Sequence, residues 1–481
     1  MSFGIIDFGA YVPHRRLQRQ AIHAANGWFA GGLKGLARGE RAVANWDEDS
    51  VTMAVEAART CLGDRDRGGI ARVMLASTSH PFTDRQNAAV VKEALVLDDA
   101  VASMDMGGGL RAGLSALTVA LTSPGTTTLC LAADKRFAAP GSEYEMTFGD
   151  AAAAFLVGEG DPIAIVRGMH SVTIDFVDHF RSSDARQDYG WESRWVRDEG
   201  YARIGAGALV DALAKLGIDG TSVDHLVVPI TLKGVPELFA KKAGIAVTAI
   251  ADSLGATVGD SGAAHAPLLL AATLEKAKPG ETIVVVGFGQ GCDILVLETT
   301  AALTAAQRGG FAATLARRTA EDNYLRHLWF SGSLAYERGM RAEQDMKTAL
   351  TALYRNRRAV LGLVGGKCNK TGTVQFPASD ISVNQNDPAI GTQEDYPLAD
   401  ITARIVTFTA DALTYSPDPP SWYGMVEFEG GGRMMAEFAD VTADDVEVGR
   451  PMRMVFRVKA IDEQRDFKRY FWKAVPVTAT A

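Results

Sequence analysis

The sequence predicts an α/β protein in which two similar halves are followed by a smaller, all-β domain. Over residues 1–300, short apolar runs alternate with helical patterns, which is typical of sheets covered by helices on both faces. This alternation occurs twice, which indicates an internal duplication. After residue 355, short runs of alternating apolar and polar residues are separated by turn residues, which is typical of a small β-barrel.

The first half begins with an expected strand at Phe3–Phe8. Ala54, Ala57, Ala58 and Cys61 recur at helical spacing and predict the first long helix. The other expected elements of this half are strands at 73–76, 102–106, 128–132, 151–157 and 164–172, and helices at 48–61, 85–95 and 110–121.

The second half repeats the same alternation of elements. Its expected helices cover 202–216, 235–243 and 262–277, and its expected strands cover 226–230, 283–287 and 293–299. The longest apolar runs suit buried strands and are too short to span a bilayer.

A change of composition near residue 301 indicates a domain boundary, because residues 301–355 are charge-rich and have a helical pattern. Five strands are then expected at 403–410, 423–429, 433–438, 451–460 and 468–476, and an OB-fold is the leading candidate for them. We therefore predict the domains 1–165, 166–300, 301–355 and 356–481.

Charge and cysteine content exclude several classes of function. A net charge of −9 argues against sequence-independent binding of nucleic acid, which needs a basic surface. The four cysteines lie far apart in the sequence, so we expect no disulfide framework and a reducing compartment. The first residues do not have the pattern of a signal peptide, and a cytoplasmic protein with no membrane partner is expected.

Several segments of the first 300 residues resemble a known superfamily when they are read in order. They include NWDEDSVTMAVEAAR at 45–59, MDMGGGLRAGLSAL at 104–117, AADKRFAAPGSEYEMTFGDAAAAFLVG at 132–158, SVTIDFVDHFR at 171–181 and KPGETIVVVGFGQGCD at 278–293. Together they resemble archaeal-type 3-hydroxy-3-methylglutaryl-CoA synthases and initiating ketoacyl-ACP synthases of the thiolase superfamily. The resemblance implies a duplicated, five-layer αβαβα thiolase fold, a coenzyme A thioester as substrate, and a homodimer.

The last third of the chain is similar to OB-fold proteins that accompany thiolases. Segments that carry this similarity include GTVQFP at 372–377 and SWYGMVEFEGGGRMMAEF at 421–438. In that family a zinc ribbon precedes the barrel, and its four cysteines form two close pairs. Here only Cys368 remains, and Thr371, Ser382 and Asp387 take the other places, so we predict no metal.

The resemblance also shows where this sequence departs from the condensing enzymes. Their nucleophilic cysteine lies at the N-terminus of a buried helix, where the helix dipole favours a thiolate. Leu110 stands at that position, and it has no lone pair with which to attack a thioester. Pro229 stands at the position of the synthases' histidine and Thr78 at that of their acid, so synthesis of hydroxymethylglutaryl-CoA by the family mechanism is not expected.

Candidate catalytic residues remain in the segment that aligns with the asparagine loop of the ketoacyl synthases. Asp260 falls on the asparagine, and His265 begins an apolar helix five residues later. A histidine beside a carboxylate is a workable general base, so we predict His265 as the base and Asp260 as its partner. The alternative is that Asp260 caps the helix and His265 is only packed in the core.

Other candidates line the expected thioester site. Glycine in the loop around Gly289 and Gly291 lets backbone N–H groups approach a thioester oxygen, and we predict these residues as oxyanion donors. Cys292 is either an acid–base group or a buried structural thiol. His80 either binds a substrate carbonyl or bonds to backbone.

Two functions follow. The first is an acyltransferase-like enzyme that cleaves or forms a C–C bond in a β-ketoacyl- or β-hydroxyacyl-CoA without a covalent acyl-enzyme. It would do so by retro-Claisen or retro-aldol cleavage, or by direct condensation of two bound acyl groups. Its reactions need only a base and an oxyanion hole. The second is a non-catalytic protein that binds coenzyme A and acts as a scaffold for another thiolase.

Overall fold

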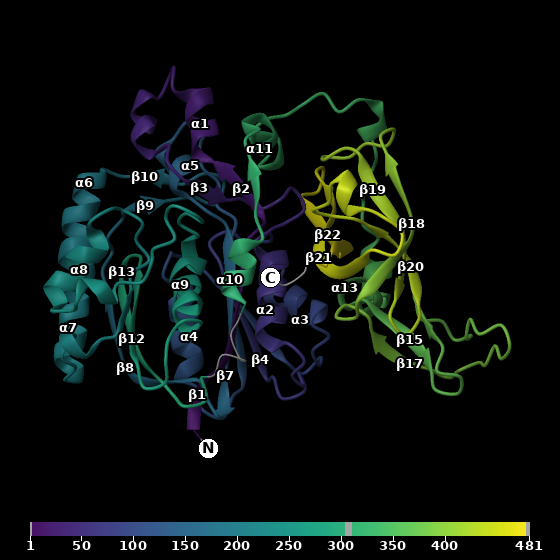
Figure 1. Cartoon of the computed structure of the whole chain (residues 1–481), viewed down its shortest axis with the longest axis horizontal. Coiled ribbons are helices and arrows are strands. Elements are labelled where there is room, and N and C mark those ends of the chain that lie inside the picture. The colour runs from purple at the N-terminus through teal and green to yellow at the C-terminus, as the bar shows by residue number, and fades with distance from the viewer. Residues whose placement is uncertain (1, 304–309, 478–481) are drawn as a thin grey trace. The chain divides into compact units, whose positions relative to one another are not determined.

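The computed structural model describes residues 2–303 and 310–477 of the chain (Figure 1). The described chain divides into two compact units. Unit 1 comprises the chain up to Asn45, Asp49–Ala89 and Asp98–Leu334, and unit 2 comprises Trp46–Glu48, Val90–Leu97 and the chain from Ala335 onward. Residues 301–334 thus belong with the first 300 by contact, and the finer domain boundaries stay predictions.

Unit 1 is built on nine strands in the order β11-β12-β13-β8-β1-β7-β6-β4-β5. Two groups of strands meet where β1 and β8 share a single registered pair, Ile5 with Ala164. The strands are β1 (Ser2–Tyr11), β4 (Arg72–Ala76), β5 (Ala102–Met106), β6 (Thr128–Asp134), β7 (Ala151–Gly160), β8 (Ala164–Thr173), β11 (His225–Val227), β12 (Thr282–Phe288) and β13 (Gly291–Thr299).

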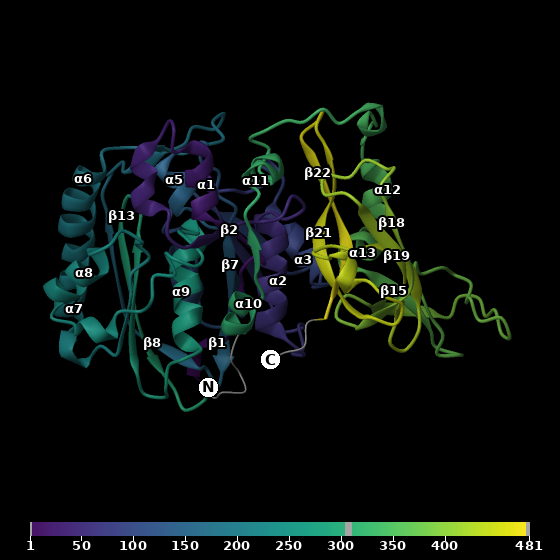
Figure 2. The same ribbon diagram turned by 45° about the horizontal axis from the view of Figure 1, so that its top comes forward.

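Helices form three layers around these strands, as Figures 1 and 2 show. The helices α4 (Ala112–Leu121) and α9 (His265–Leu274) pack against each other between the two groups of strands. Outside them, α2 (Ser50–Leu62) covers β1, β6 and β7, while α7 (Ala206–Leu216) and α8 (Val235–Ala243) lie on the side of β12 and β13. This arrangement is the predicted five-layer αβαβα fold.

The central layer buries both of its helices almost completely, because α4 and α9 are apolar on every side rather than along one stripe. Their side chains join those of the strands on either side in one large hydrophobic core. The loop before α9 is buried at Gly262–Ala264, whereas the loop before α4 is exposed at Gly107 and Gly108 and becomes half-buried at Leu110.

The predicted helix at 202–216 differs from the structure at its start. A π-helical segment covers Val196–Gly205, and α7 then begins at Ala206. The wider turns press against aromatic rings: a Cβ at Gly200 would lie 2.7 Å from Phe176, and one at Gly205 would lie 2.7 Å from Phe239. Glycine at both positions permits this contact, which a side chain would block.

The remaining elements of unit 1 are short and lie near the ends of the main strands. They are β2 (Arg15–Gln18), α1 (Arg19–Asn26), β3 (Glu40–Ala42), α3 (Asn87–Ala94, shared with unit 2), α5 (Glu143–Thr147), β9 (His179–Phe180), β10 (Tyr189–Gly190), α6 (Ser193–Trp195), α10 (Phe311–Ala316), β14 (Thr319–Glu321) and α11 (Tyr324–Phe330). The expectation of a helical linker over 301–355 is therefore only partly correct: β14 pairs in parallel with β2, and the described helices there have six or seven residues. Residues 304–309 lie outside the described part.

Unit 2 contains the predicted small β domain. Its five-stranded sheet has the order β20-β19-β18-β21-β22, and a bridge between Phe438 and Ala474 joins the segment after β20 to β22. The indole of Trp472 is buried and donates to the backbone carbonyl of Leu361 at 2.7 Å. The elements of this unit are α12 (Leu350–Arg355), α13 (Arg357–Gly362), β15 (Val364–Cys368), β16 (Val374–Gln375), β17 (Gln393–Pro397), β18 (Ala403–Asp411), β19 (Ser421–Phe428), β20 (Arg433–Glu437), β21 (Pro451–Asp462) and β22 (Phe467–Pro476).

No helix in the described part of the chain is long and apolar enough to cross a membrane.

Candidate functional site

Leu110 lies half-buried at the start of α4, at the meeting point of two cavities in unit 1. The loop from Gly107 to Leu110 leads from β5 into the helix, and Gly108 has a φ of +89°, which a residue with a side chain rarely adopts. The guanidinium of Arg111 is 2.9 Å from Asp293 on β13, so an ion pair fixes the first turn against the neighbouring strand.

We call the first cavity, of about 560 Å³, the polar cavity. It is lined by hydroxyl, amide and charged side chains, including Ser77, Thr78, His80, Asn87, Asp105 and Gln290. The second, of about 670 Å³, is the aromatic cavity, which is lined by Tyr144, Phe148, Trp191, Tyr201 and Phe288 together with Arg136 and Asp260. Both cavities are lined by Leu110, Asp178 and His179.

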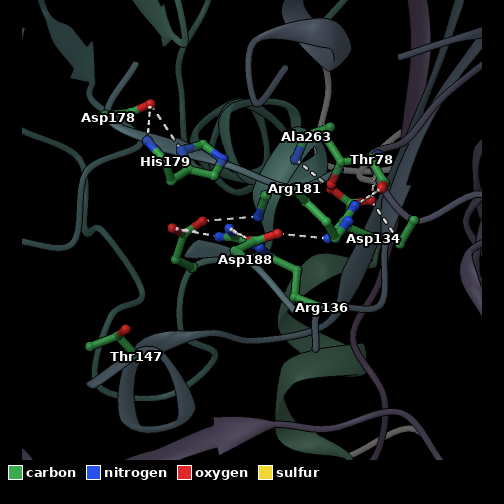
Figure 3. Close-up of polar contacts among 12 residues, drawn as sticks. Thr78, Asp134, Arg136, Thr147, Asp178, His179, Arg181, Asp188 and Ala263 are labelled. Atoms are coloured by element: carbon green, nitrogen blue, oxygen red, sulfur yellow. Dashed lines mark hydrogen bonds and ion pairs between the residues drawn. The ribbon is translucent and has the colours of Figure 1, made fainter. Parts of the chain in front are cut away.

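Asp178 and His179 form a carboxylate–imidazole pair (Figure 3), and both residues line the two cavities that Leu110 also lines. Nδ1 of His179 lies 2.9 Å from Oδ1 of Asp178, and the backbone N–H of His179 donates to the same oxygen at 2.9 Å. A carboxylate that accepts from Nδ1–H leaves the lone pair on Nε2, which is the form of histidine that accepts a proton. The pair is therefore equipped to act as a general base at the junction of the two cavities.

A chain of alternating charges connects the two cavities (Figure 3). Arg136 bridges two carboxylates, at 2.9 Å to Asp260 and 2.8 Å to Asp188, and Arg181 lies 2.7 Å from the other oxygen of Asp188. The Arg136 side chain is 3% exposed, and its guanidinium lies 3.4 Å from the centre of the Phe148 ring. Burial acts to raise the pKa of Asp260, but Arg136 and the neighbouring donors outweigh it, so this pKa lies below its usual value.

Asp134 connects the loop of Ser77 and Thr78, which lines the polar cavity, to the loop of Asp260–Ala263, which lines the aromatic cavity (Figure 3). Its buried carboxylate accepts from the backbone N–H of Thr78 at 2.7 Å, from the Thr78 hydroxyl at 2.9 Å and from the N–H of Ala263 at 2.7 Å. The hydroxyls of Ser77 and Ser79 also donate to it. Thr78 thus directs its hydroxyl toward Asp134, which positions the loop.

Asp260 and His265, the predicted pair, interact electrostatically, but no hydrogen bond joins their side chains within the described residues. Asp260 lines the aromatic cavity, and its second oxygen accepts from the backbone N–H of Gly262 at 2.9 Å. His265 is 1% exposed, lines neither cavity, and has Nδ1 at 3.2 Å from the hydroxyl of Ser261. Burial lowers the pKa of His265, although Asp260 opposes this shift. Their catalytic roles stay predictions.

The glycine-rich loop does lie against position 110. A Cβ at Gly289 would lie 3.1 Å from the backbone nitrogens of both Leu110 and Arg111. Gly289 lines the polar cavity, but its N–H donates to the carbonyl of Gly291 at 3.1 Å, and Gly291 lines neither cavity. The predicted oxyanion role of these two glycines stays a prediction.

The remaining predicted residues also have defined places. His80 lines the polar cavity, and its Nε2 lies 3.3 Å from the backbone carbonyl of Leu75. Cys292 is fully buried on β13, and burial raises the pKa of its thiol. Burial also raises the pKa of Cys130 to about 12. Neither described cavity is lined by a cysteine.

Sequence reasoning did not select Asp178, His179, Arg136, Tyr144 and Tyr201 as site residues. The only signal was that Asp178 and His179 are adjacent within the segment 171–181. Adjacency does not predict a bond between two side chains, because neighbours on an extended chain point to opposite sides. The turn before β9 brings these two side chains together.

In unit 2, the residues that replace the zinc ligands bond to other protein groups. The Cys368 thiol lies 3.0 Å from the Thr392 hydroxyl, and Thr371 donates to the hydroxyl of Thr373. Asp387 forms an ion pair with Lys370 at 2.8 Å. Within the described residues, no group of three or more histidine, cysteine and acidic side chains is arranged to hold a metal ion.

We therefore predict that chelators leave the stability of the purified protein unchanged. Incubation with EDTA and 1,10-phenanthroline should not shift the melting temperature, because removal of a structural zinc would remove folding energy and none is expected here. Differential scanning calorimetry and metal analysis of the same sample test this. Stoichiometric zinc, or a fall in melting temperature after chelation, would contradict it.

Comparison with solved structures shows the fold of the first unit. MvaS in complex with 3-hydroxy-3-methylglutaryl coenzyme A has a TM-score of 0.59 at 19% identity, covering 70% of this chain and 93% of that one. The 3-oxoacyl-(acyl carrier protein) synthase III of Pseudomonas aeruginosa has a TM-score of 0.55 at 21% identity, covering 62% and 98%. The first unit therefore has the thiolase-like fold that the sequence predicts.

Curated relatives define the family. The hydroxymethylglutaryl-CoA synthase of Archaeoglobus fulgidus is 31% identical over 313 residues, which are 62% of this chain and 90% of the relative. That of Methanosarcina barkeri is 31% identical over 302 residues, or 60% and 86%. The chain belongs to the hydroxymethylglutaryl-CoA synthase family. Residues 395–457 match the family of the C-terminal OB-fold domain of ChsH2, which confirms the predicted OB-fold.

Proposed function

We propose that this chain acts on a coenzyme A thioester and cleaves or forms a carbon–carbon bond in a β-hydroxyacyl or β-ketoacyl substrate without a covalent acyl-enzyme. The observation that carries the proposal is the Asp178–His179 pair, which lines both cavities, as Leu110 does. Family membership and solved relatives in complex with coenzyme A support the thioester as substrate.

Retro-aldol cleavage of a β-hydroxyacyl thioester needs no other reactant. Nε2 of His179 accepts the proton of the β-hydroxyl group, and the bond between Cα and Cβ breaks as Cβ becomes a carbonyl carbon. The electron pair of that bond forms the thioester enolate, and the imidazolium then returns its proton to Cα. The products are an aldehyde or ketone and a shortened acyl-CoA, and in reverse the same steps form the bond.

The side chains at the junction argue against covalent acylation. Leucine at position 110 has no nucleophilic atom, and Cys130 and Cys292 are buried with raised thiol pKa values, so neither forms a thiolate readily. His179 lines both cavities, and this arrangement suits a reaction that breaks or forms a bond between two fragments of the substrate. Each fragment would occupy one cavity, and His179 would reach the bond between them.

We place the base at His179 rather than at His265. A general base lies within about 2.6–3.2 Å of the proton that it removes, or reaches it through one water. His179 lines both cavities, whereas His265 is enclosed behind Ser261. In this proposal Asp260 and Arg136 hold the wall of the aromatic cavity, and Asp260 is a positioning residue. A homodimer and a cytoplasmic location remain predictions.

The proposal is tested by incubating the purified full chain with a panel of β-hydroxyacyl- and β-ketoacyl-CoAs. By mass spectrometry, we expect a β-hydroxyacyl-CoA to give a shortened acyl-CoA and an aldehyde or ketone. We expect a β-ketoacyl-CoA, with water as the second reactant, to give a shortened acyl-CoA and a carboxylic acid. Neither reaction should leave an acyl adduct on the intact protein. Leu110→Cys is the control for adduct detection, because it places a thiol at the helix N-terminus. Turnover through a stable acyl adduct on the wild-type chain would contradict the mechanism. Tight binding of coenzyme A without turnover across the panel would favour the scaffold function.

A further inference from the structure

Two tyrosines of the aromatic cavity have hydroxyl groups without a protein partner. Tyr144 lies in α5 and Tyr201 in the π-helical segment Val196–Gly205, and both line the cavity. Within the described residues, no hydrogen bond is made by either hydroxyl, and neither hydroxyl is sealed from the cavity. A half-buried phenol usually finds a partner, so the pair is available to a ligand.

Packing fixes both rings and leaves only the hydroxyl ends free. The Tyr144 ring stacks on Phe148 with centres 4.6 Å apart and planes 16° apart. The Tyr201 ring meets Phe288 edge to face at 5.0 Å and 73°. A ring held in this way presents its hydroxyl in one direction, so little side-chain entropy is lost when a ligand accepts a bond from it.

Both phenols stay protonated near neutral pH. Burial raises the pKa of Tyr144 to about 12, and burial reinforced by Asp178 and Asp260 raises that of Tyr201 further. Each hydroxyl is therefore a hydrogen-bond donor rather than a phenolate. A neutral donor in a site partly closed to water is suited to an oxygen atom that gains negative charge during a reaction.

We propose that Tyr144 and Tyr201 donate hydrogen bonds to the thioester oxygen of the substrate and act as catalytic residues. The inference rests on the proposed function, because an enolate oxygen is the charge that these donors stabilise. They line the same cavity as His179 and Leu110, so a thioester at the junction lies within the same space. The N–H of Gly289 already donates to Gly291, which leaves the phenols as uncommitted donors near the site.

The test compares two ligands that differ in the carbonyl group alone. Butyryl-CoA is a thioester, and S-butyl-CoA is the matching thioether without the oxygen. In isothermal titration calorimetry, we expect wild-type protein to prefer the thioester. Tyr144→Phe and Tyr201→Phe should each reduce that preference by about 3- to 10-fold and leave thioether binding unchanged, because each removes one neutral hydrogen bond. With a substrate from the panel, kcat should fall by roughly 10- to 10³-fold.

Two further variants separate the hydroxyl from general damage to the cavity. Gly190→Ala keeps Tyr144 but places a methyl group where the Tyr144 hydroxyl lies, so it should weaken the thioester preference as Tyr144→Phe does. Tyr354→Phe is the matched control, because Tyr354 is 68% exposed in unit 2 and should change nothing. Melting temperatures confirm that each variant is folded.

The outcomes distinguish this inference from the proposed function. An unchanged thioester preference in both single variants and in the double variant would overturn the role of the tyrosines, even if the wild-type enzyme turns over. A reduced preference without any wild-type turnover would support the hydrogen bonds and overturn the proposed reaction. Failure of the wild-type chain to bind either ligand would overturn both.

Discussion

Changing His179 to glutamine is expected to lower kcat for carbon–carbon cleavage by about 10²- to 10⁴-fold, the usual contribution of a general base. Glutamine has a similar size and keeps a donor for Asp178, but its amide does not accept a proton at neutral pH. Binding of the substrate should change little, because the cavities on both sides keep their shape. The effect should therefore appear in kcat rather than in KM.

Two other histidine variants serve as comparisons for His179→Gln. His265→Gln tests the alternative base, and we expect it to retain most of the turnover if the variant is folded, because the His265 ring faces Ser261. His225→Gln is the surface control, since His225 pairs with Glu281 far along the sheet from the site. Loss of turnover in His265→Gln at unchanged stability, with His179→Gln active, would reverse the assignment.

Replacing Arg136 with methionine is expected to destabilise the fold by about 3–5 kcal/mol, the cost of leaving buried charges without a partner. Methionine fills a similar length and keeps contact with Phe148 but removes both ion pairs. Asp260 would then lose the ion pair that Arg136 forms with it, whereas Asp188 would keep its ion pair with Arg181. No nearby lysine is bonded to either carboxylate in the described structure.

Urea denaturation at several pH values measures this change. In the wild-type chain the pKa of Asp260 is lowered, so its ion pair stabilises the fold above the unfolded pKa and is lost as pH falls through the folded pKa. In Arg136→Met, burial without the cation raises that pKa. The destabilisation should therefore be largest at neutral pH and smaller in mild acid, where Asp260 binds a proton.

A second substitution tests whether the uncompensated charge is the cause. Adding Asp260→Asn to Arg136→Met removes the carboxylate that has lost its arginine and should recover part of the lost stability. Arg203→Met is the control, because that arginine is 79% exposed and pairs only with Glu199 one turn away. Equal losses from Arg136→Met and Arg203→Met would show that the buried network contributes nothing.

Much of the architecture could be predicted from residue patterns, because buried strands and helices impose them locally. The helix at 235–243 and the five strands of the OB-fold agree with the structure to within a few residues. Continuous apolar strands and helices that are apolar all round are sufficient to predict a layered α/β unit. In the described part of 301–355, the α-helices have only six or seven residues, and the β14 strand pairs with β2, which the charged residues at helical spacing did not indicate.

The site was predicted less completely, because its contacts join residues far apart in the chain. Leu110, Gly289 and Asp260 were placed near one another by resemblance, and the structure brings them to the same pair of cavities. The partners of Arg136 are 52 and 124 residues away, and no local pattern indicates such pairs. His265 and Asp260 were matched by their spacing, yet each bonds to a different neighbour.

Position 110 shows which property of the site follows from the residue type and which follows only from the tertiary structure. The residue type alone establishes that a leucine has no nucleophile to offer, and this holds whatever the fold. Which imidazole lines the same cavities as that leucine depends on how segments far apart in the sequence fold together. The chemistry of a side chain is set by its residue type. A general base must also lie at the right distance and in the right direction from the proton that it removes, and that geometry arises only when distant segments fold together.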